Sequence, residues 1–334
     1  MKELILTGIL AFSLPLSGCT GEAGQRQALE AKEIGTVQEE YLTTENTVGD
    51  VVSHPAFAGF GQFILPLEWG YDAGMTLAEI PSLLPYHSHI DPQQAVDTIN
   101  GMADMAIDGK LAYYGIYAEE EKSANREKEN AGIFFFRGEP DAPFAVICPG
   151  GGFSYVGSIH EGFPYAMELN KKGYNAFVIQ YRTGGAQQAC EDLAAGLSYI
   201  FRNAEELRVD TEGYSLWGGS AGARMAAYLG SYGAAAFGGD SLPKPAAVIM
   251  QYTGHTDYTE NEPPTFVAVG ENDGIANWRT MERRTGTLAA MGIETEFHKY
   301  PNLGHGFGLG IGTSAEGWLE LAIDFWERQV ANQY

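Results

Sequence analysis

Residues 214–222 read Tyr214-Ser215-Leu216-Trp217-Gly218-Gly219-Ser220-Ala221-Gly222. The first four predict a short buried strand, and the run from Ala223 to Leu229, rich in good helix formers, predicts a helix. Between them, a G-x-S-x-G pattern places Ser220 on the turn from strand to helix. Flanking glycines leave room for the neighbouring backbone, and the strained turn lifts the serine hydroxyl clear of it. The pattern therefore predicts a nucleophilic serine above a helix N-terminus, which favours negative charge.

The regions around this turn alternate between strand-like and helix-like runs. Strand candidates are Leu111–Tyr117, Gly132–Arg137, Phe144–Cys148, Ala176–Tyr181, Gly213–Trp217, Ala246–Tyr252, Thr265–Val269 and Glu294–Tyr300. Helix candidates are Leu77–Leu84, Pro92–Met105, Phe163–Lys172, Gln187–Leu207, Ala221–Ser231, Ala276–Met291 and Ala315–Ala331. This alternation predicts the α/β class, with a mostly parallel eight-stranded sheet covered by helices on both faces. The charged run Glu119–Asn130 is expected to be a solvated hairpin loop.

A glycine-rich turn, Pro149-Gly150-Gly151-Gly152-Phe153, follows the Phe144–Cys148 strand. Backbone N–H groups of Gly151 or Gly152 can approach a ligand closely, because glycine carries no side chain. Together with the N–H of Ala221, they are candidates for an oxyanion hole. Alone, the turn is equally typical of tight backbone packing. Combined with the serine turn, it favours oxyanion binding.

The histidine candidate is His305, in the run Asn302-Leu303-Gly304-His305-Gly306-Phe307 after the last predicted strand. The loop after the preceding strand, Gly270-Glu271-Asn272-Asp273-Gly274, supplies the acid. Asp273 is our choice, with Glu271 as the alternative. The order Ser220, Asp273, His305, each after a strand, is typical of a Ser-Asp-His triad.

Other histidines and the cysteines carry weaker signals. We expect His160 and His255 on the surface, with the rim of the site as the alternative, and His298 within the last strand. The alternation His87-Ser88-His89 lacks a neighbouring cysteine or carboxylate cluster, so we expect no metal there. Cys148 and Cys190 are expected as buried free thiols, although their spacing leaves a disulfide open.

The composition limits the possible partners. The chain has 334 residues, of which 45% are hydrophobic, enough for one large α/β domain or two small ones. Asp and Glu number 43 against 20 Lys and Arg, giving a formal charge of −23. This balance argues against nucleic acid binding, which needs a basic surface.

The N-terminal residues are typical of an export signal and are not expected to form part of the folded domain. Lys2 and the short apolar run Leu4–Leu16 lead to Leu16-Ser17-Gly18-Cys19, which resembles the lipobox of bacterial lipoproteins. This resemblance implies a signal peptide over residues 1–18, a lipid on Cys19, and attachment to the outer face of a membrane in the cell envelope. A plain secretory signal with an incidental cysteine is the alternative. Residues 19–50 are acidic and without periodicity, and are expected to be a flexible tether.

Residues 51–108 are rich in aromatic side chains interrupted by Gly and Pro. Only Gly254–Pro264 separates the two strand candidates between which many lipases insert a lid. We therefore expect the segment Val51–Asp108 to pack over the C-terminal edge of the sheet and to wall the pocket. The alternative is that it covers an exposed sheet edge elsewhere.

Residues 109–334 resemble an α/β-hydrolase, and within that superfamily the acetyl-esterase and hormone-sensitive-lipase-like group. The glycine loop, a downstream Glu161-Gly162 and the stretch from Gly173 to Arg182 carry the resemblance to carbohydrate esterases. Better-known members have the sequence His-Gly-Gly-Gly in this loop, and here Pro149 replaces the histidine.

The resemblance implies a serine carboxylesterase for short acyl, especially acetyl, esters of sugars or polysaccharides, without metal or organic cofactor. Ser220 would attack the ester carbonyl, His305 would transfer the proton, and Asp273 would orient the imidazole. Two alternatives remain: a prolyl-oligopeptidase-like peptidase, and a binding module on an inactive hydrolase scaffold.

Overall fold

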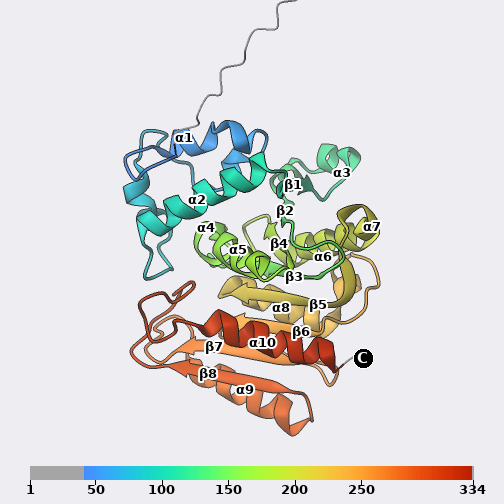
Figure 1. Cartoon of the computed structure of the whole chain (residues 1–334). Coiled ribbons are helices and arrows are strands. Elements are labelled where there is room, and N and C mark those ends of the chain that lie inside the picture. Colours follow the sequence, from blue (N-terminus) through green and yellow to red (C-terminus); the bar gives the residue numbers. More distant parts are fainter. Residues whose placement is uncertain (1–40, 333–334) are drawn as a thin grey trace, which may run out of the picture. The chain divides into compact units, whose positions relative to one another are not determined.

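An eight-stranded sheet forms the centre of the computed structural model, which describes residues 41–332 (Figure 1). The strands are β1 (Leu111–Gly115), β2 (Gly132–Phe136), β3 (Pro143–Cys148), β4 (Asn175–Gln180), β5 (Asp210–Gly219), β6 (Ala247–Gln251), β7 (Thr265–Gly270) and β8 (Thr295–Tyr300). Their order is β1-β2-β4-β3-β5-β6-β7-β8. β2 pairs antiparallel with β1 and β4, and the remaining neighbours pair in parallel. The predicted fold class and all eight predicted strands are confirmed.

Helices cover both faces of the sheet, because its strands are apolar on both sides. On one face lie α5 (Phe163–Lys171) and α10 (Trp318–Ala331), and on the other lie α6 (Ala186–Arg202), α8 (Ala221–Tyr232) and α9 (Trp278–Ala290). In β3, Ala145 and Ile147 face the first layer, whereas Val146 and Cys148 face the second. The helix predicted over Gln187–Leu207 is interrupted at Asn203, so that α7 (Ala204–Leu207) is separate.

The charged run between β1 and β2 is helical, so the expected loop is wrong in its local structure. It forms α3 (Glu119–Ala124) and the 3₁₀ helix η4 (Arg126–Asn130). Three glutamates occupy the first turn of α3, where the helix dipole favours negative charge. Lys122 and Lys128 pair with Glu119 and Glu121 at 2.8 and 2.9 Å. The run does connect an antiparallel pair of strands, as predicted.

The N-terminal segment belongs to the same compact unit as the sheet, from Tyr41 onward. The flexible tether predicted to extend to residue 50 is therefore wrong for residues 41–50. Leu42 and Val48 are buried, and Thr47 and Asp50 form a reciprocal cap for α1 (Val48–Val52). Three short 3₁₀ helices and α2 (Pro92–Ile107) follow: η1 (Pro55–Phe57), η2 (Gly61–Phe63) and η3 (Leu77–Leu83). α2 packs against β1 and against α4 (Ser158–Glu161).

The predicted signal peptide and Cys19 lie outside the described residues, as does most of the predicted tether. Within residues 41–332, no helix combines the length and apolar content that crossing a bilayer requires.

Candidate active site

Ser220 sits on a strained turn between β5 and α8. Its backbone has φ 51° and ψ −112°, a conformation that costs a side-chain-bearing residue about 1–3 kcal/mol. The positions two residues before and after Ser220 must be glycine, because any side chain there would overlap backbone atoms. A Cβ on Gly222 would lie 1.8 Å from the carbonyl oxygen of Cys148, and one on Gly218 would lie 2.3 Å from the carbonyl carbon of Gly222. The close approach of helix and strand thus holds the hydroxyl at the sheet edge.

The structure brings the three predicted residues Ser220, Asp273 and His305 into one hydrogen-bonded chain. Nε2 of His305 lies 2.8 Å from Oγ of Ser220, and Nδ1 lies 2.7 Å from Oδ2 of Asp273. The Asp273 side chain is fully buried, and its other oxygen accepts the backbone N–H groups of Ile275 and Ala276 at 2.8 and 2.7 Å. A carboxylate at Nδ1 holds the proton there, which leaves Nε2 able to accept the serine proton.

Glu271, the alternative acid, lies elsewhere. Its carboxylate pairs with Lys299 on β8 at 2.9 Å, and both side chains are partly exposed. Of the two carboxylates on this loop, Asp273 is therefore the one that contacts the imidazole.

A cavity of about 280 Å³ opens onto Ser220 and His305. Its lining consists of Gly152, Phe153, Ser220, Ala221, Arg224, Tyr252, Thr253, Gly254, Ile275, Ala276 and His305. Gly152 and Ala221 thus share the cavity with Ser220, and neither backbone N–H donates a hydrogen bond within the described part of the chain. Gly151 does not line this cavity; its carbonyl accepts the N–H groups of Ser154 and Tyr155 and shapes the turn. The oxyanion hole stays a prediction.

A buried carboxylate, Glu161, lies behind the glycine loop and the serine turn. It has no exposed surface, and its Oε2 accepts the N–H of Gly150 at 2.6 Å. Its Oε1 accepts the hydroxyl of Tyr252 at 2.7 Å and lies 2.8 Å from Nε2 of His87, an ion-pair distance without hydrogen-bond alignment. Burial alone would raise the pKa of Glu161, but His87 and the Tyr252 hydroxyl outweigh it and lower the pKa to about 2. The Tyr252 ring also packs edge-on against His305, at 5.0 Å between centroids.

The turn before α2 contacts the loops of the site. The hydroxyl of Ser88 donates to the carbonyl of His305 at 2.6 Å, and the N–H of Ser88 donates to the carbonyl of Gly306 at 2.9 Å. Nδ1 of His87 lies 2.8 Å from the hydroxyl of Tyr155, which also accepts the N–H of Tyr86. The alternation His87-Ser88-His89 was visible in the sequence, but nothing local to it indicated these distant contacts.

No residue of Val51–Asp108 lines the cavity around Ser220. The segment does come close to it, because a Cβ on Gly152 would lie 3.1 Å from the Tyr86 ring, and the hypothesis that the segment walls the pocket stays a prediction. α2 covers the β1 edge of the sheet, as the alternative stated, while the turn before α2 supports the site. The segment thus approaches the site from the side of β1 and α4.

Of the two histidines expected on the surface, His255 is buried and His160 is partly buried. His255 is only 2% exposed, and burial, with the charges of Arg284 and Arg224, lowers its pKa to about 4. Burial and the neighbouring His87 lower the pKa of His160 to about 4, although Glu161 opposes this shift. Nε2 of His160 lies 3.1 Å from the carbonyl oxygen of Gly306. Loop position alone did not indicate these contacts.

The other residues considered in the sequence are His298 and the two cysteines. His298 lies in β8, as predicted, and contacts Glu296 at 3.0 Å. Cys148 and Cys190 are free and buried, which confirms the predicted thiols. Among residues 41–332, no group of three or more His, Cys, Asp and Glu is placed to hold a metal ion.

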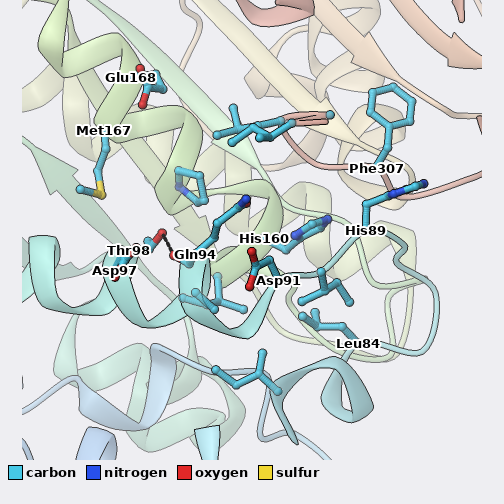
Figure 2. A pocket seen from close by; sticks show the side chains of 18 of the residues that line it. Leu84, His89, Asp91, Gln94, Asp97, Thr98, His160, Met167, Glu168 and Phe307 are labelled. Carbon is cyan, nitrogen blue, oxygen red and sulfur yellow. Dashed lines mark hydrogen bonds between the residues drawn. The ribbon is translucent and has the colours of Figure 1, made fainter. Parts of the chain in front are cut away.

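A second cavity, of about 300 Å³, lies between α2, α5 and the loop that follows His305 (Figure 2). Side chains that face it include Asp91, Gln94, His160 and Phe307, and none of Ser220, Asp273 and His305 lines it. The hydrogen-bonded chain therefore assigns the chemistry to the cavity around Ser220.

Comparison of the whole chain with solved structures identifies its fold. An α/β-hydrolase from a Medee basin deep-sea metagenome library superposes with a TM-score of 0.55, covering 66% of this chain and 98% of that one at 21% identity. The chain has the α/β-hydrolase fold. An acetyl ester-xyloside bifunctional hydrolase from Caldicellulosiruptor lactoaceticus gives a TM-score of 0.57 at 17% identity, covering 65% of this chain and 96% of that one.

Sequence comparison matches a shorter part of this α/β-hydrolase-fold chain. Residues 137–241 match the BD-FAE family. An endo-1,4-beta-xylanase B of Butyrivibrio fibrisolvens is 33% identical over 90 residues, which are 25% of this chain and 14% of that protein. An acetylxylan esterase of Xylanibacter ruminicola is 27% identical over 99 residues, which are 29% of this chain and 21% of that protein. The chain thus spans only a minor part of the length of these curated relatives.

Proposed function

We propose that this chain is a serine carboxylesterase that cleaves short acyl esters through an acyl-enzyme. The observation that carries the proposal is the contact of His305 with both Ser220 and Asp273, at the mouth of a cavity that Gly152 and Ala221 also line. A buried imidazole with a carboxylate on one nitrogen and a serine hydroxyl on the other can accept the serine proton and later donate it to the leaving group.

The reaction follows from this geometry. Nε2 of His305 accepts the Ser220 proton while Oγ forms a bond to the ester carbonyl carbon. The carbonyl oxygen becomes an oxyanion, which the N–H groups of Gly152 and Ala221 stabilise. The tetrahedral intermediate collapses, the ester C–O bond breaks, and the imidazolium returns the proton to the leaving alcohol. Water then attacks the acyl-enzyme by the same steps, giving the carboxylic acid and free serine.

Short acyl groups on carbohydrates are the proposed substrates. A cavity of about 280 Å³ lies near the lower end of the usual range for small-molecule sites, which favours acetyl and similar groups. The names of an acetylxylan esterase and of an acetyl ester-xyloside hydrolase among the similar proteins support a sugar as the alcohol.

Labelling with a fluorophosphonate probe tests the nucleophile. We expect the folded protein to be labelled and the Ser220→Ala variant to be unlabelled, with ester turnover lowered by about 10⁴-fold or more. Ser314→Ala, which removes an exposed hydroxyl bonded to the carbonyl of Pro301, is the control and should be labelled like the parent. An unlabelled folded parent would instead support the inactive scaffold.

A substrate panel tests the reaction class. We expect turnover of p-nitrophenyl esters to fall as the acyl chain lengthens beyond a few carbons, and acetylated xylan oligomers to lose acetate. Faster turnover of a proline-containing amide than of p-nitrophenyl acetate would favour the peptidase alternative.

We also propose that Cys19 carries a lipid that holds the enzyme on the outer face of a membrane in the bacterial cell envelope. The lipobox-like run before Cys19 supports this. After expression of the full chain in a bacterium, detergent-phase partitioning should retain the parent and release Cys19→Ala. Equal partitioning of the two proteins would contradict the anchor.

A further inference from the structure

Arg224 is a charged side chain in the Ser220 cavity for which the proposed mechanism has no role. It lies in the first turn of α8, and its backbone N–H donates to the carbonyl of Ser220 at 3.4 Å. Side chains on a helix tend to lean toward the helix N-terminus, which in α8 is the end next to Ser220. It is exposed and lines the cavity together with Ser220 and His305.

The guanidinium of Arg224 has no carboxylate partner within residues 41–332, taking 4.0 Å as the limit for an ion pair. Arginines that do pair with Asp or Glu are Arg182, Arg202, Arg208, Arg284 and Arg328. With 43 acidic residues against 20 basic ones, the chain has carboxylates in excess. An unpaired arginine facing this cavity therefore does not result from a shortage of acids.

The cavity itself offers Arg224 no carboxylate. No Asp or Glu lines the cavity, and α8 has no acidic residue in its first turn. The N-terminal end of a helix carries partial positive charge, so a cation in the first turn is unfavourable there. A bound anion would relieve this repulsion and give the guanidinium the partner that the chain does not provide.

We propose that Arg224 binds a carboxylate of the substrate, so that the preferred esters are anionic. The carboxylate can belong to the acyl group, as in a dicarboxylic half-ester, or to the alcohol, as in an acetylated uronic acid. Guanidinium is suited to this contact because its parallel N–H groups match the two carboxylate oxygens. The inference rests on the proposed esterase function and names the chemistry of its substrate.

Two pairs of substrates separate the two sources of the carboxylate. The acyl pair is mono-p-nitrophenyl succinate against p-nitrophenyl butyrate. The alcohol pair is an acetylated methyl glucuronide against the matching acetylated methyl glucoside. For each pair, the ratio of kcat/KM for the anionic over the neutral ester is measured in the parent, Arg224→Gln and Arg224→Lys. Arg283→Gln is the control, because Arg283 is exposed on α9 and does not line the cavity.

We expect the ratio for one pair to fall about tenfold in Arg224→Gln, because a charge-assisted contact is lost. Arg224→Lys should retain part of the ratio, Arg283→Gln should leave it as in the parent, and added salt should lower it in the parent. Equal losses for anionic and neutral esters, or no change in either ratio, would overturn the inference while leaving the esterase function intact. A parent that hydrolyses none of the four esters would overturn both.

Discussion

The parallel part of the sheet and the N-terminal segment contribute to the site in different ways. Ser220, Asp273 and His305 follow β5, β7 and β8, and strands that run parallel bring such loops to the same edge. The N-terminal segment does not line the cavity. However, its His87 contacts Glu161, and its Ser88 contacts the loop that carries His305. Regular elements thus deliver the reacting groups, and an irregular segment holds them in position.

Among the residues of the sheet region that support the serine, the acid is expected to have the largest effect on turnover. In Asp273→Asn the amide cannot hold the Nδ1 proton of His305 as the carboxylate does, so kcat should fall by about 10³–10⁴-fold with the fold intact. Steady-state kinetics with p-nitrophenyl acetate measure this, and circular dichroism checks the fold.

Glu271→Gln is the matched control on the same loop. Its partner Lys299 is partly exposed, and such a pair contributes at most about 1 kcal/mol, so turnover should change less than about threefold. If Glu271→Gln lost more activity than Asp273→Asn, the roles of the two acids would be reversed.

The next prediction tests the contact between His87 of the N-terminal segment and Glu161 of the sheet region. Glu161→Gln removes a buried charge beside His87, which should lower the free energy of unfolding by roughly 3 kcal/mol and also lower kcat. Because the pKa of Glu161 falls from 4.5 when unfolded to about 2 when folded, its stabilising contribution is complete above pH 4.5. That contribution is lost as the pH falls from 4.5 to about 2. Denaturant unfolding measured across this window should show a weaker pH dependence in the variant.

Two further variants make this test specific. Glu168→Gln, which breaks an exposed pair with Lys171, should change stability by less than about 1 kcal/mol. His87→Gln combined with Glu161→Gln should cost less than the sum of the two single changes, because the residues are in contact. Additive losses would show that the two regions are not coupled through this pair.

The same comparison explains what the sequence could predict. Ser220, Asp273 and His305 were found because each lies in a glycine-containing loop that follows a strand, and strand periodicity is a local signal. The contacts of His87 and Ser88 are with residues up to 217 positions away in the chain, which no local pattern encodes. For the same reason, the burial of His255 became visible only in the folded chain.

The next prediction concerns the buried His255 and the dependence of stability on pH. The pKa of His255 falls from 6.5 when unfolded to about 4 when folded, so acid protonates the unfolded chain first. Its contribution to stability is therefore complete above pH 6.5 and is lost as the pH falls to about 4, by up to roughly 3 kcal/mol. His255→Gln should reduce this loss, while His89→Gln, at an exposed position, should leave it unchanged. Parallel stability curves for parent and His255→Gln would contradict the assignment.

The smallest effect tests how the N-terminal segment holds the catalytic loop. Ser88→Ala removes the hydroxyl that donates to the carbonyl of His305, which should cost about 1 kcal/mol of stability. A histidine held less firmly should lower kcat several-fold and leave KM little changed, since Ser88 does not line the cavity. Ser82→Ala is the control, because the Ser82 hydroxyl also donates to a backbone carbonyl, that of Glu79 in η3, away from the site. If both variants lost stability equally and neither lost turnover, the segment would stabilise the fold without positioning His305, and the division between reacting and holding regions would be wrong for this contact.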